Sequence, residues 1–457
     1  MHQLFSFCVP QRGIKSPRHR ALVQGAMLRT RSHRITLFQP RSLYFSVRAS
    51  KNQRQTSWLA RWGIPRPPLG PRVFPTSGFE TIDVFDGVEE ENLSIYKPEI
   101  FYPVHIGEVF QNRYQVVTKL GFGSSSTTWL GHDIQDGKYV SLKVHTNTVQ
   151  SSHELGVYEH LKKHTPLLSP LHIRPLEGSF AIQGPHGRHD ILVQEPLAVS
   201  MPDFQHKVPG KVFPSFLVKE ALKQVVPCLD FLHSDAHVIH TDFHPANLLI
   251  GLSDPDECLA QVEEAELKSP APRKVMKDRT IYTSCAVYGN IGPLYLCDFG
   301  QARIGDEGSG NVMPIPFRAP EIILGMKWSY PIDMWSVALS TWYLLQPKML
   351  FGVYDTDNLR LNDAHHLANM IALLGPPPLD YLKRSEKYLE FWNENGDWRG
   401  IAPIPQEKTL ESLEKSLNGD ERARFLDFVR ALLRWAPEER LTAKQALSHP
   451  WLTAPYK

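Results

Sequence analysis

The first 79 residues of this 457-residue chain contain no aspartate or glutamate. They carry 14 lysine and arginine residues, which leaves 36 basic against 48 acidic residues between positions 80 and 457. The net charge of +2 therefore conceals a basic N-terminal segment in front of an acidic body. Cysteine is also scarce. The five cysteines are scattered along the chain, and no pair has CxxC spacing. This excludes a disulfide scaffold and a zinc ribbon, and it favours a reducing compartment.

Long hydrophobic runs are absent as well. The longest apolar stretch, 337–345, is interrupted by Ser340 and Thr341. It is shorter than the ~18 residues that a membrane-spanning helix needs, and it predicts a buried core helix instead. The chain has no internal repeat. Its 42% apolar and 10% aromatic residues are enough for a sizeable core, which excludes a wholly disordered or collagen-like chain.

The basic segment 1–79 supports two interpretations. Its arginine-rich, serine-containing and acid-free composition is typical of a mitochondrial transit peptide. The same composition is that of a disordered basic arm that contacts nucleic acid or acidic partners. Four prolines between positions 65 and 71 predict a stiff linker before the fold.

From residue 114 onward the pattern changes from strands to helices. We expect strands near 114–120, 127–130, 139–144 and 191–195, with one helix over 151–163. Further helices are expected at 215–233, 332–346, 364–374, 409–417, 421–434 and 442–447. The stretch 251–290 is polar and is interpreted as an insertion. The coarse prediction is an α+β chain with a small strand-rich lobe followed by a larger helical lobe.

A glycine turn and a lysine are the first residues that suggest chemistry. The turn Gly121-Phe-Gly123-x-x-Ser126 would let backbone N–H groups approach phosphates. Lys143 lies twenty residues after Gly123 in the apolar strand 139–144, where it would anchor phosphate oxygens. The glycine turn alone also fits an ordinary hairpin, and the lysine alone also fits an exposed edge strand.

The segment 240–250 is the strongest local signal. Asp242 is followed five residues later by Asn247, on a loop that enters a strand. At this spacing the carboxylate can orient and deprotonate a hydroxyl while the amide oxygen ligates Mg²⁺. The sequence Asp298-Phe-Gly300 follows the strand 293–297. The carboxylate of Asp298 is a second ligand of the kind that hard cations prefer.

Three further residues have structural interpretations. Glu321 and Arg440 carry opposite charges and are expected to form a buried pair. Asp333 begins the apolar helix and is expected to cap backbone amides.

In order and spacing, residues 114–452 resemble the eukaryotic protein kinases. The ordered matches are Gly121, Gly123, Lys143, Glu154, Asp242, Asn247, Asp298, Ala-Pro-Glu at 319–321, Asp333 and Arg440. More narrowly, the chain resembles the serine/arginine-rich (SR) protein kinases, particularly their short fungal members. The features that carry this narrower resemblance are residues 102–108 before Arg113-Tyr114, Trp129 after the glycine turn, His-Thr-Asp at 240–242 and the insertion that follows.

The resemblance implies a bilobal kinase fold, with a small antiparallel β-sheet N-lobe that carries one helix and a larger, mainly helical C-lobe. Its expected divisions are a basic tail or transit peptide (1–79), an extension onto the N-lobe (80–113), the N-lobe (114–195) and the C-lobe (196–452) with the insertion 251–290.

It also implies roles for individual residues. Those expected around ATP are Leu120, Gly121, Gly123 and Ser126 over the phosphates, Lys143 with its partner Glu154, and Glu195 and Leu197 at the adenine edge beside Gln194. Asp242 would be the catalytic base, and Asn247 and Asp298 would hold Mg²⁺.

The sequence departs from the kinase pattern at two positions that normally bond to each other. His244 stands where protein kinases usually carry a lysine near the γ-phosphate, and Pro314 stands where serine/threonine kinases usually carry threonine. Thr241 also replaces the arginine that reads a phosphorylated activation loop, and Ser309 is the one hydroxyl residue between 298 and 321. Activation by loop phosphorylation is therefore not expected.

These features predict a serine/threonine protein kinase that uses ATP and Mg²⁺. Its substrate would be a basic, Arg/Ser-rich protein, which suits the acidic body and implies a role in mRNA processing. We expect a monomer that binds no nucleic acid through the kinase domain, in the cytoplasm or nucleus by resemblance or in the mitochondrion by its N-terminus.

Two alternatives remain open. A pseudokinase scaffold is favoured by His244 and Pro314. A small-molecule kinase similar to aminoglycoside phosphotransferases would suit His244, but such enzymes lack the Ala-Pro-Glu, Asp333 and Arg440 elements.

Overall fold

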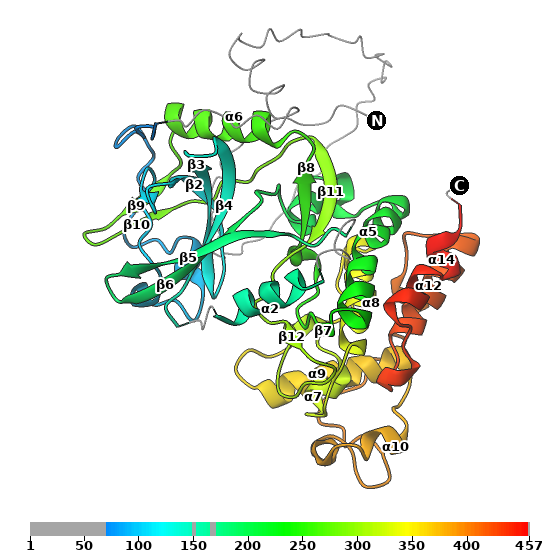
Figure 1. Cartoon of the computed structure of the whole chain (residues 1–457). Helices are drawn as coiled ribbons and strands as arrows, with labels where there is room; N and C mark the ends of the chain where they lie inside the picture. The colour runs from blue at the N-terminus through cyan, green and yellow to red at the C-terminus, as the bar shows by residue number, and fades with distance from the viewer. Residues whose placement is uncertain (1–69, 149–151, 165–170, 456–457) are drawn as a thin grey trace, which may run out of the picture.

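The computed structural model describes residues 70–148, 152–164 and 171–455 (Figure 1). The basic segment up to residue 69 lies outside these ranges, so both interpretations of it stay predictions. Among the described residues, no helix has the length and apolarity to cross a membrane.

The N-lobe is built on a six-stranded antiparallel sheet with the strand order β1-β2-β3-β4-β6-β5. Its strands are β1 (Val109–Phe110), β2 (Tyr114–Phe122), β3 (Ser126–Asp133), β4 (Lys138–His145), β5 (Leu176–Gly184) and β6 (Gly187–Gln194). Helix α2 (Ser152–Lys162) packs Val157, Tyr158 and Leu161 into the same buried cluster as Leu192 of β6. The four expected strands and the expected helix are all present. The edge strand β5 was not predicted, because most of its side chains are only partly buried and give no clear alternation.

The C-lobe is organised around helix α8 (Pro331–Leu345), whose tryptophans Trp335 and Trp342 are buried. The core helix predicted from the run 337–345 is confirmed. Around it lie α5 (Ser215–Ser234), α9 (Leu359–Leu374) and α12 (Gly419–Leu432) (Figure 1). The shorter helices are α4 (Met201–Gln205), α7 (Pro320–Ile323), α10 (Leu379–Leu382), α11 (Leu410–Leu413), α13 (Ala443–Leu447) and α14 (Pro450–Thr453).

Two short antiparallel pairs set the loops that matter for function side by side. Strand β7 (Val238–Ile239) pairs with β12 (Arg303–Ile304), and β8 (Leu248–Leu252) pairs with β11 (Ile291–Leu296). The segment 240–247 joins β7 to β8, while 297–302 joins β11 to β12. Because the strands that flank one segment pair with the strands that flank the other, the two segments lie next to each other.

The insertion 251–290 is folded and lies on the N-lobe, although it follows a C-lobe strand. It forms helix α6 (Pro255–Lys268) and a hairpin of β9 (Arg273–Val275) and β10 (Thr280–Tyr282). Leu259 and Val262 of α6 share a buried cluster with Val117 of β2 and Leu130 of β3. Figure 1 shows α6 lying across these strands.

The described residues before the expected boundary at residue 80 already pack on the N-lobe. Phe74 is buried in the cluster under α6, and the Gln115 side chain exchanges two 2.8 Å hydrogen bonds with the backbone of Arg72. The extension 80–113 then continues along the sheet through the 3₁₀ turns Glu89–Asn92 and Pro98–Ile100. A bridge between Thr81 and Arg273 connects it to the insertion. The extension and the insertion therefore contact each other as well as the sheet.

Candidate active site

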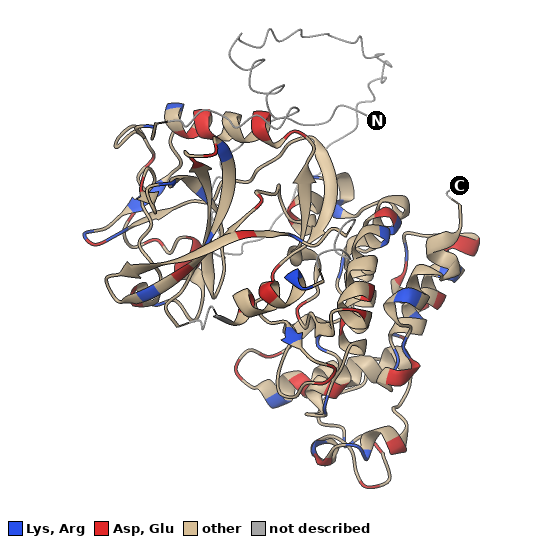
Figure 2. Cartoon of the chain, in the orientation of Figure 1, with Lys and Arg blue, Asp and Glu red and all other residues tan. Residues whose placement is uncertain are grey.

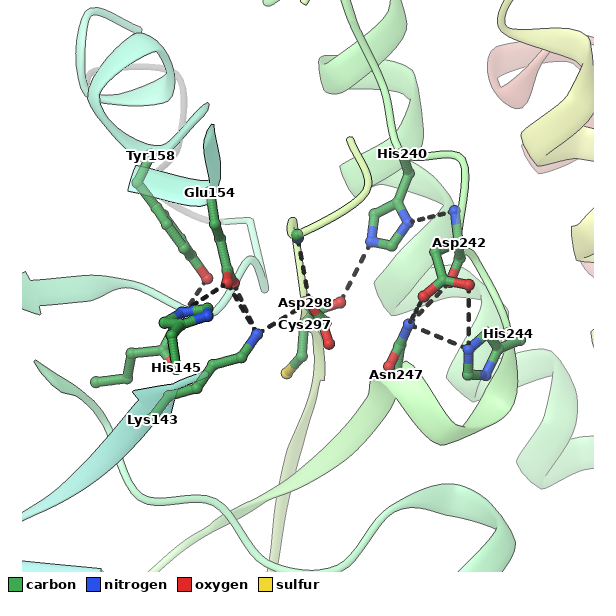
Figure 3. Close-up of polar contacts among 12 residues, drawn as sticks. Lys143, His145, Glu154, Tyr158, His240, Asp242, His244, Asn247, Cys297 and Asp298 are labelled. Atoms are coloured by element: carbon green, nitrogen blue, oxygen red, sulfur yellow. Dashed lines mark hydrogen bonds and ion pairs between the residues drawn. The ribbon is translucent and has the colours of Figure 1, made fainter. Parts of the chain in front are cut away.

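Lys143 and Glu154 form a buried ion pair between the sheet and helix α2 (Figure 3). Lys143 Nζ donates to both carboxylate oxygens of Glu154, at 3.0 and 2.9 Å. Burial alone would lower the pKa of Lys143, but the negative charges of Asp298 and Glu154 outweigh it and raise that pKa. The lysine therefore stays charged within the lobe.

Asp298 reaches the same ammonium group from the segment after β11. Its Oδ1 lies 3.0 Å from Lys143 Nζ and accepts the backbone N–H of Gly300 at 3.1 Å. Burial would raise the pKa of Asp298, but the charge and hydrogen bond of Lys143 hold it well below its usual range. The backbone of Asp298 has φ of 64°, a left-handed conformation that is uncommon outside glycine. Such strain is concentrated at functional sites.

Asp242, Asn247 and His244 form a second group that faces the first. Asn247 Nδ2 donates to the backbone oxygen of Asp242 at 2.9 Å and to its Oδ2 at 3.1 Å. The same nitrogen lies 3.2 Å from His244 Nε2, which in turn lies 3.4 Å from Asp242 Oδ1. Because Nδ2 is committed to these contacts, the amide oxygen of Asn247 is the atom left for a cation.

The Asp333 side chain fixes the loop that carries Asp242 through its backbone. The Asp333 carboxylate accepts the backbone N–H of His240 at 2.8 Å and of Thr241 at 2.9 Å. The sequence predicted that Asp333 caps amides, and it does so for this loop rather than for its own helix. The predicted pair of Glu321 and Arg440 is confirmed, with two hydrogen bonds of 2.6 and 2.7 Å between buried side chains.

A cluster of aromatic rings connects the two lobes behind the site. The ring of Phe299 lies 5.4 Å from that of Tyr158 on α2 and 5.2 Å from that of His240. All three side chains are buried. Gln194 Nε2 donates to the Tyr158 hydroxyl at 2.8 Å, so the residue expected beside the adenine also contacts α2.

The glycine turn leaves open space where phosphates are expected. Gly123 N donates to Ser126 O at 2.8 Å and closes the turn between β2 and β3. A Cβ added at Gly121 or Gly123 would meet no atom within 4 Å. The room beside both glycines is thus available to a ligand. Leu120 precedes the turn on β2, partly buried, and Ser126 is buried at the start of β3.

The segment between the lobes differs from the expected adenine site in one respect. The backbone oxygen of Glu195 accepts two hydrogen bonds from Arg174, at 3.1 Å from Nε and 2.7 Å from Nη2. An adenine amino group at this carbonyl would have to share it with Arg174. Leu197 follows Pro196 in the same segment and is buried.

The segment from Asp298 to Glu321 is held by hydrogen bonds to its backbone. Thr241 Oγ1 donates to Gln301 O at 2.7 Å. Gly308 and Trp328 exchange two backbone hydrogen bonds of 2.8 and 3.0 Å, and Trp328 Nε1 donates to Gly310 O at 3.0 Å. Pro314 directly precedes the turn 315–317, and the ring of Phe317 at the end of that turn packs 5.6 Å from that of His244.

Three residues of the site were not singled out in the sequence. Arg174 binds the Glu195 carbonyl, and His153 Nε2 lies 2.7 Å from Ala302 O, connecting α2 to the segment after Asp298. His145 lies 3.3 Å from Glu154. Only His145 had a usable signal, because its position two residues after Lys143 places both side chains on the same face of the strand.

Comparisons with known proteins agree with this geometry. The model of the protein kinase domain matches residues 114–452. A serine/threonine protein kinase of Aspergillus fumigatus is 39% identical over 395 residues, which cover 85% of this chain and 96% of the relative. The serine/threonine-protein kinase SRPK of Physarum polycephalum is 30% identical over 400 residues, covering 81% and 92%. The crystal structure of a kinase domain aligns with a TM-score of 0.57 at 21% identity, covering 77% of this chain and 99% of that one.

Proposed function

This chain belongs to the protein kinase family, and from that premise we propose that it transfers the γ-phosphate of ATP to serine hydroxyls in Arg/Ser-rich protein segments. The predicted fold, the resemblance to SR protein kinases and the enzyme class, serine/threonine protein kinase, are confirmed by the comparisons. Use of ATP and a divalent cation follows from the family. The convergence of Asp242, Asn247 and Asp298 beside the Lys143–Glu154 pair carries the proposal.

Asp242 is proposed as the base that accepts the proton of the substrate hydroxyl. Its carboxylate is 22% exposed, and Asn247 holds one oxygen by hydrogen bonding. The fixed orientation of the carboxylate is what general base catalysis requires. Asp333 supports this orientation from below through the loop backbone.

Lys143 is proposed to bind the α- and β-phosphates while Glu154 holds it in place. Asn247 and Asp298 are proposed to hold Mg²⁺, since an amide and a carboxylate oxygen are ligands that this ion accepts. When bound, Mg²⁺ would neutralise charge on the phosphate oxygens. The turn that contains Gly121 has room for phosphates beside its backbone.

The basic substrate class is supported by the chain's charge and by its relatives. Residues 80–457 hold 48 acidic against 36 basic residues, and a relative is named SRPK. Acidic residues occur on helices of both lobes with basic residues between them (Figure 2). Electrostatic complementarity of this kind increases the association rate and the specificity for basic partners.

The kinase is also proposed to be active without phosphorylation of the segment after Asp298. Thr241 contacts that segment through its hydroxyl instead of through a phosphate-reading arginine. The exchange of hydrogen bonds between Gly308 and Trp328 fixes the segment farther along. These contacts need no added charge.

A pseudokinase is the second candidate function, favoured by His244 in place of lysine. His244 Nε2 is 3.4 Å from Asp242 Oδ1, so it is close enough to reach the reacting groups. A histidine offers less electrostatic stabilisation than lysine, and loss of one such donor costs roughly 10²- to 10³-fold in rate. The enzyme is therefore expected to be slow but active.

The test is ATP turnover by the full chain with Mg²⁺, comparing wild type with Asp298→Ala. Asp278→Ala, which removes an exposed carboxylate of the insertion, is the matched control. An Arg/Ser-repeat peptide, a generic basic protein and an aminoglycoside are offered in parallel. Transfer to the peptide that disappears in Asp298→Ala and persists in Asp278→Ala supports the proposal. Transfer to the aminoglycoside alone assigns a small-molecule kinase, and nucleotide binding without any transfer assigns a pseudokinase.

A further inference from the structure

A histidine on β4 makes a second buried contact with Glu154. His145 Nε2 lies 3.3 Å from Glu154 Oε2, and both side chains are 2% exposed (Figure 3). Strand alternation places His145 and Lys143 on the same face of β4. The Glu154 carboxylate therefore lies between an ammonium group and an imidazole that come from one strand.

The imidazole of His145 has little else to satisfy it. Within the described parts of the chain, neither ring nitrogen has a well-aligned hydrogen bond. A buried polar group without a partner costs folding free energy, so the approach to Glu154 is the polar contact that offsets this cost. A small rotation of the ring or of the carboxylate would align the Nε2–H with Oε2.

Glu154 needs a second donor because its first donor is shared. Lys143 Nζ contacts Glu154 and also Asp298, at 3.0 Å, so one positive charge serves two carboxylates. Burial would raise the pKa of Glu154, but the charge of Lys143 and the nearby imidazole of His145 outweigh burial and lower it. When bound phosphates compete for the charge of Lys143, the buried carboxylate of Glu154 would be destabilised if it had no other donor.

The ring of His145 is placed by rigid structure. His145 pairs with Ser126 in the β3–β4 register, directly beside the glycine turn. Its backbone oxygen lies 2.9 Å from Nδ1 of the buried His189 on β6.

At the other side of α2, His153 contacts Ala302 O. Helix α2 is thus held both by the sheet and by the segment after Asp298.

We propose that His145 is a positioning residue for phosphoryl transfer, which holds Glu154 in the orientation that grips Lys143 and so keeps α2 docked without any phosphorylated residue. This inference rests on the proposed kinase function. The contact that stabilises Glu154 then comes from strand β4 itself.

The test replaces His145 by leucine, glutamine and asparagine in the full chain. The glutamine amide nitrogen reaches about as far as Nε2 and can donate to Glu154, whereas the asparagine amide reaches only as far as Nδ1. We expect His145→Leu and His145→Asn to raise the KM for ATP and lower kcat, with kcat/KM falling roughly 10- to 100-fold. His145→Gln should stay within about threefold of wild type.

His132→Leu is the matched control, because it removes another buried histidine–glutamate contact on the same sheet. His132 on β3 lies 3.4 Å from Glu263 of α6, away from Lys143. The control should lower the melting temperature about as much as His145→Leu, yet leave the KM for ATP unchanged. If His145→Leu and His145→Gln lose stability equally and keep wild-type kcat and KM, the inference is overturned.

Nucleotide affinity separates this inference from the proposed function. If wild type transfers phosphate to no substrate, the proposed function fails, and the Kd for MgATP then decides the role of His145. Weaker binding by His145→Leu that His145→Gln restores supports the positioning role. Equal Kd values for wild type and both variants overturn it.

Discussion

Replacement of Glu90 by glutamine should destabilise the sheet of the N-lobe, because Glu90 neutralises a buried lysine. Lys119 of β2 has a side chain that is 0% exposed and forms an ion pair with Glu90 of the extension. Its other partners are Glu89 Oε2 at 3.8 Å and the backbone oxygen of Tyr282 at 3.2 Å. The ammonium group also lies 5.3 Å from the ring centre of Phe122, which lies within the glycine turn.

The expected loss of stability depends on the partners that Lys119 keeps after the substitution. Removal of one partner from a buried ion pair costs about 3–5 kcal/mol, since it leaves an uncompensated charge. Because Glu89 and the Tyr282 carbonyl stay in place, we expect the lower end, about 3 kcal/mol. Replacing both partners with apolar residues, Lys119→Met with Glu90→Leu, should be within about 1 kcal/mol of wild type.

Amide hydrogen exchange of β2 measures this cost locally, which matters because a bilobal protein does not have to unfold in one step. The control is Glu177→Gln, which breaks an exposed N-lobe pair with Lys138 and should cost less than about 1 kcal/mol. Wild-type protection of β2 in Glu90→Gln would refute the reasoning, because Lys119 would then be solvated and the extension undocked. A double variant as unstable as Glu90→Gln would refute the charge argument alone.

Three further outcomes are expected. Glu321→Gln leaves the buried guanidinium of Arg440 with half of its bidentate partner and should lower the free energy of unfolding by about 3–5 kcal/mol in urea denaturation. Burial would raise the pKa of Glu263, but hydrogen bonds from β3 and β4 side chains hold it below 4.5. The stabilisation that ionised Glu263 provides is therefore present above that pH and lost as the pH falls through the lower pKa of the folded state. The protection factors of α6 amides should therefore fall below about pH 4.5 in wild type but not in Glu263→Gln. His244→Lys places a permanent positive charge beside Asp242, the proposed base, and should raise kcat by at least about tenfold; an unchanged or lower kcat would show that the histidine is not what limits the rate.

The sequence points to candidate site residues by their type and spacing, but it does not reveal the partners that these residues meet in the fold. Lys143 stands out as a charge inside an apolar strand, and Asp242 with Asn247 stands out by spacing. Their burial and mutual contacts follow from strand pairing, which also brings in Asp298. Asp333 shows the limit of this reasoning: a carboxylate at a helix start predicts a cap, but only the fold decides which amides it meets.

The insertion was the least predictable part of the fold. Helix α6 had a proline at its start and acidic residues in its first turn, which are helix-start signals. Its buried face, however, consists of a few apolar side chains together with charged ones such as Glu263 and Glu266. These charges are buried because β2, β3 and β4 supply partners far away in sequence. No local pattern reveals such partners.

The contacts around α2 explain how an arrangement suited to phosphoryl transfer can exist without added phosphate. Formation of the Lys143–Glu154 pair requires α2 to lie against the sheet, and the helix is fastened there at three points. Tyr158 packs edge-on against Phe299, His153 contacts Ala302 O, and Glu154 itself contacts His145. Two of these points lie on the segment that begins at Asp298, and that segment is fastened in turn by Thr241 and Trp328. Each fastening is a hydrogen bond, an ion contact or a ring contact supplied by the chain, so control of the activity should act on access of substrate or on the extension over β2 rather than on assembly of the site.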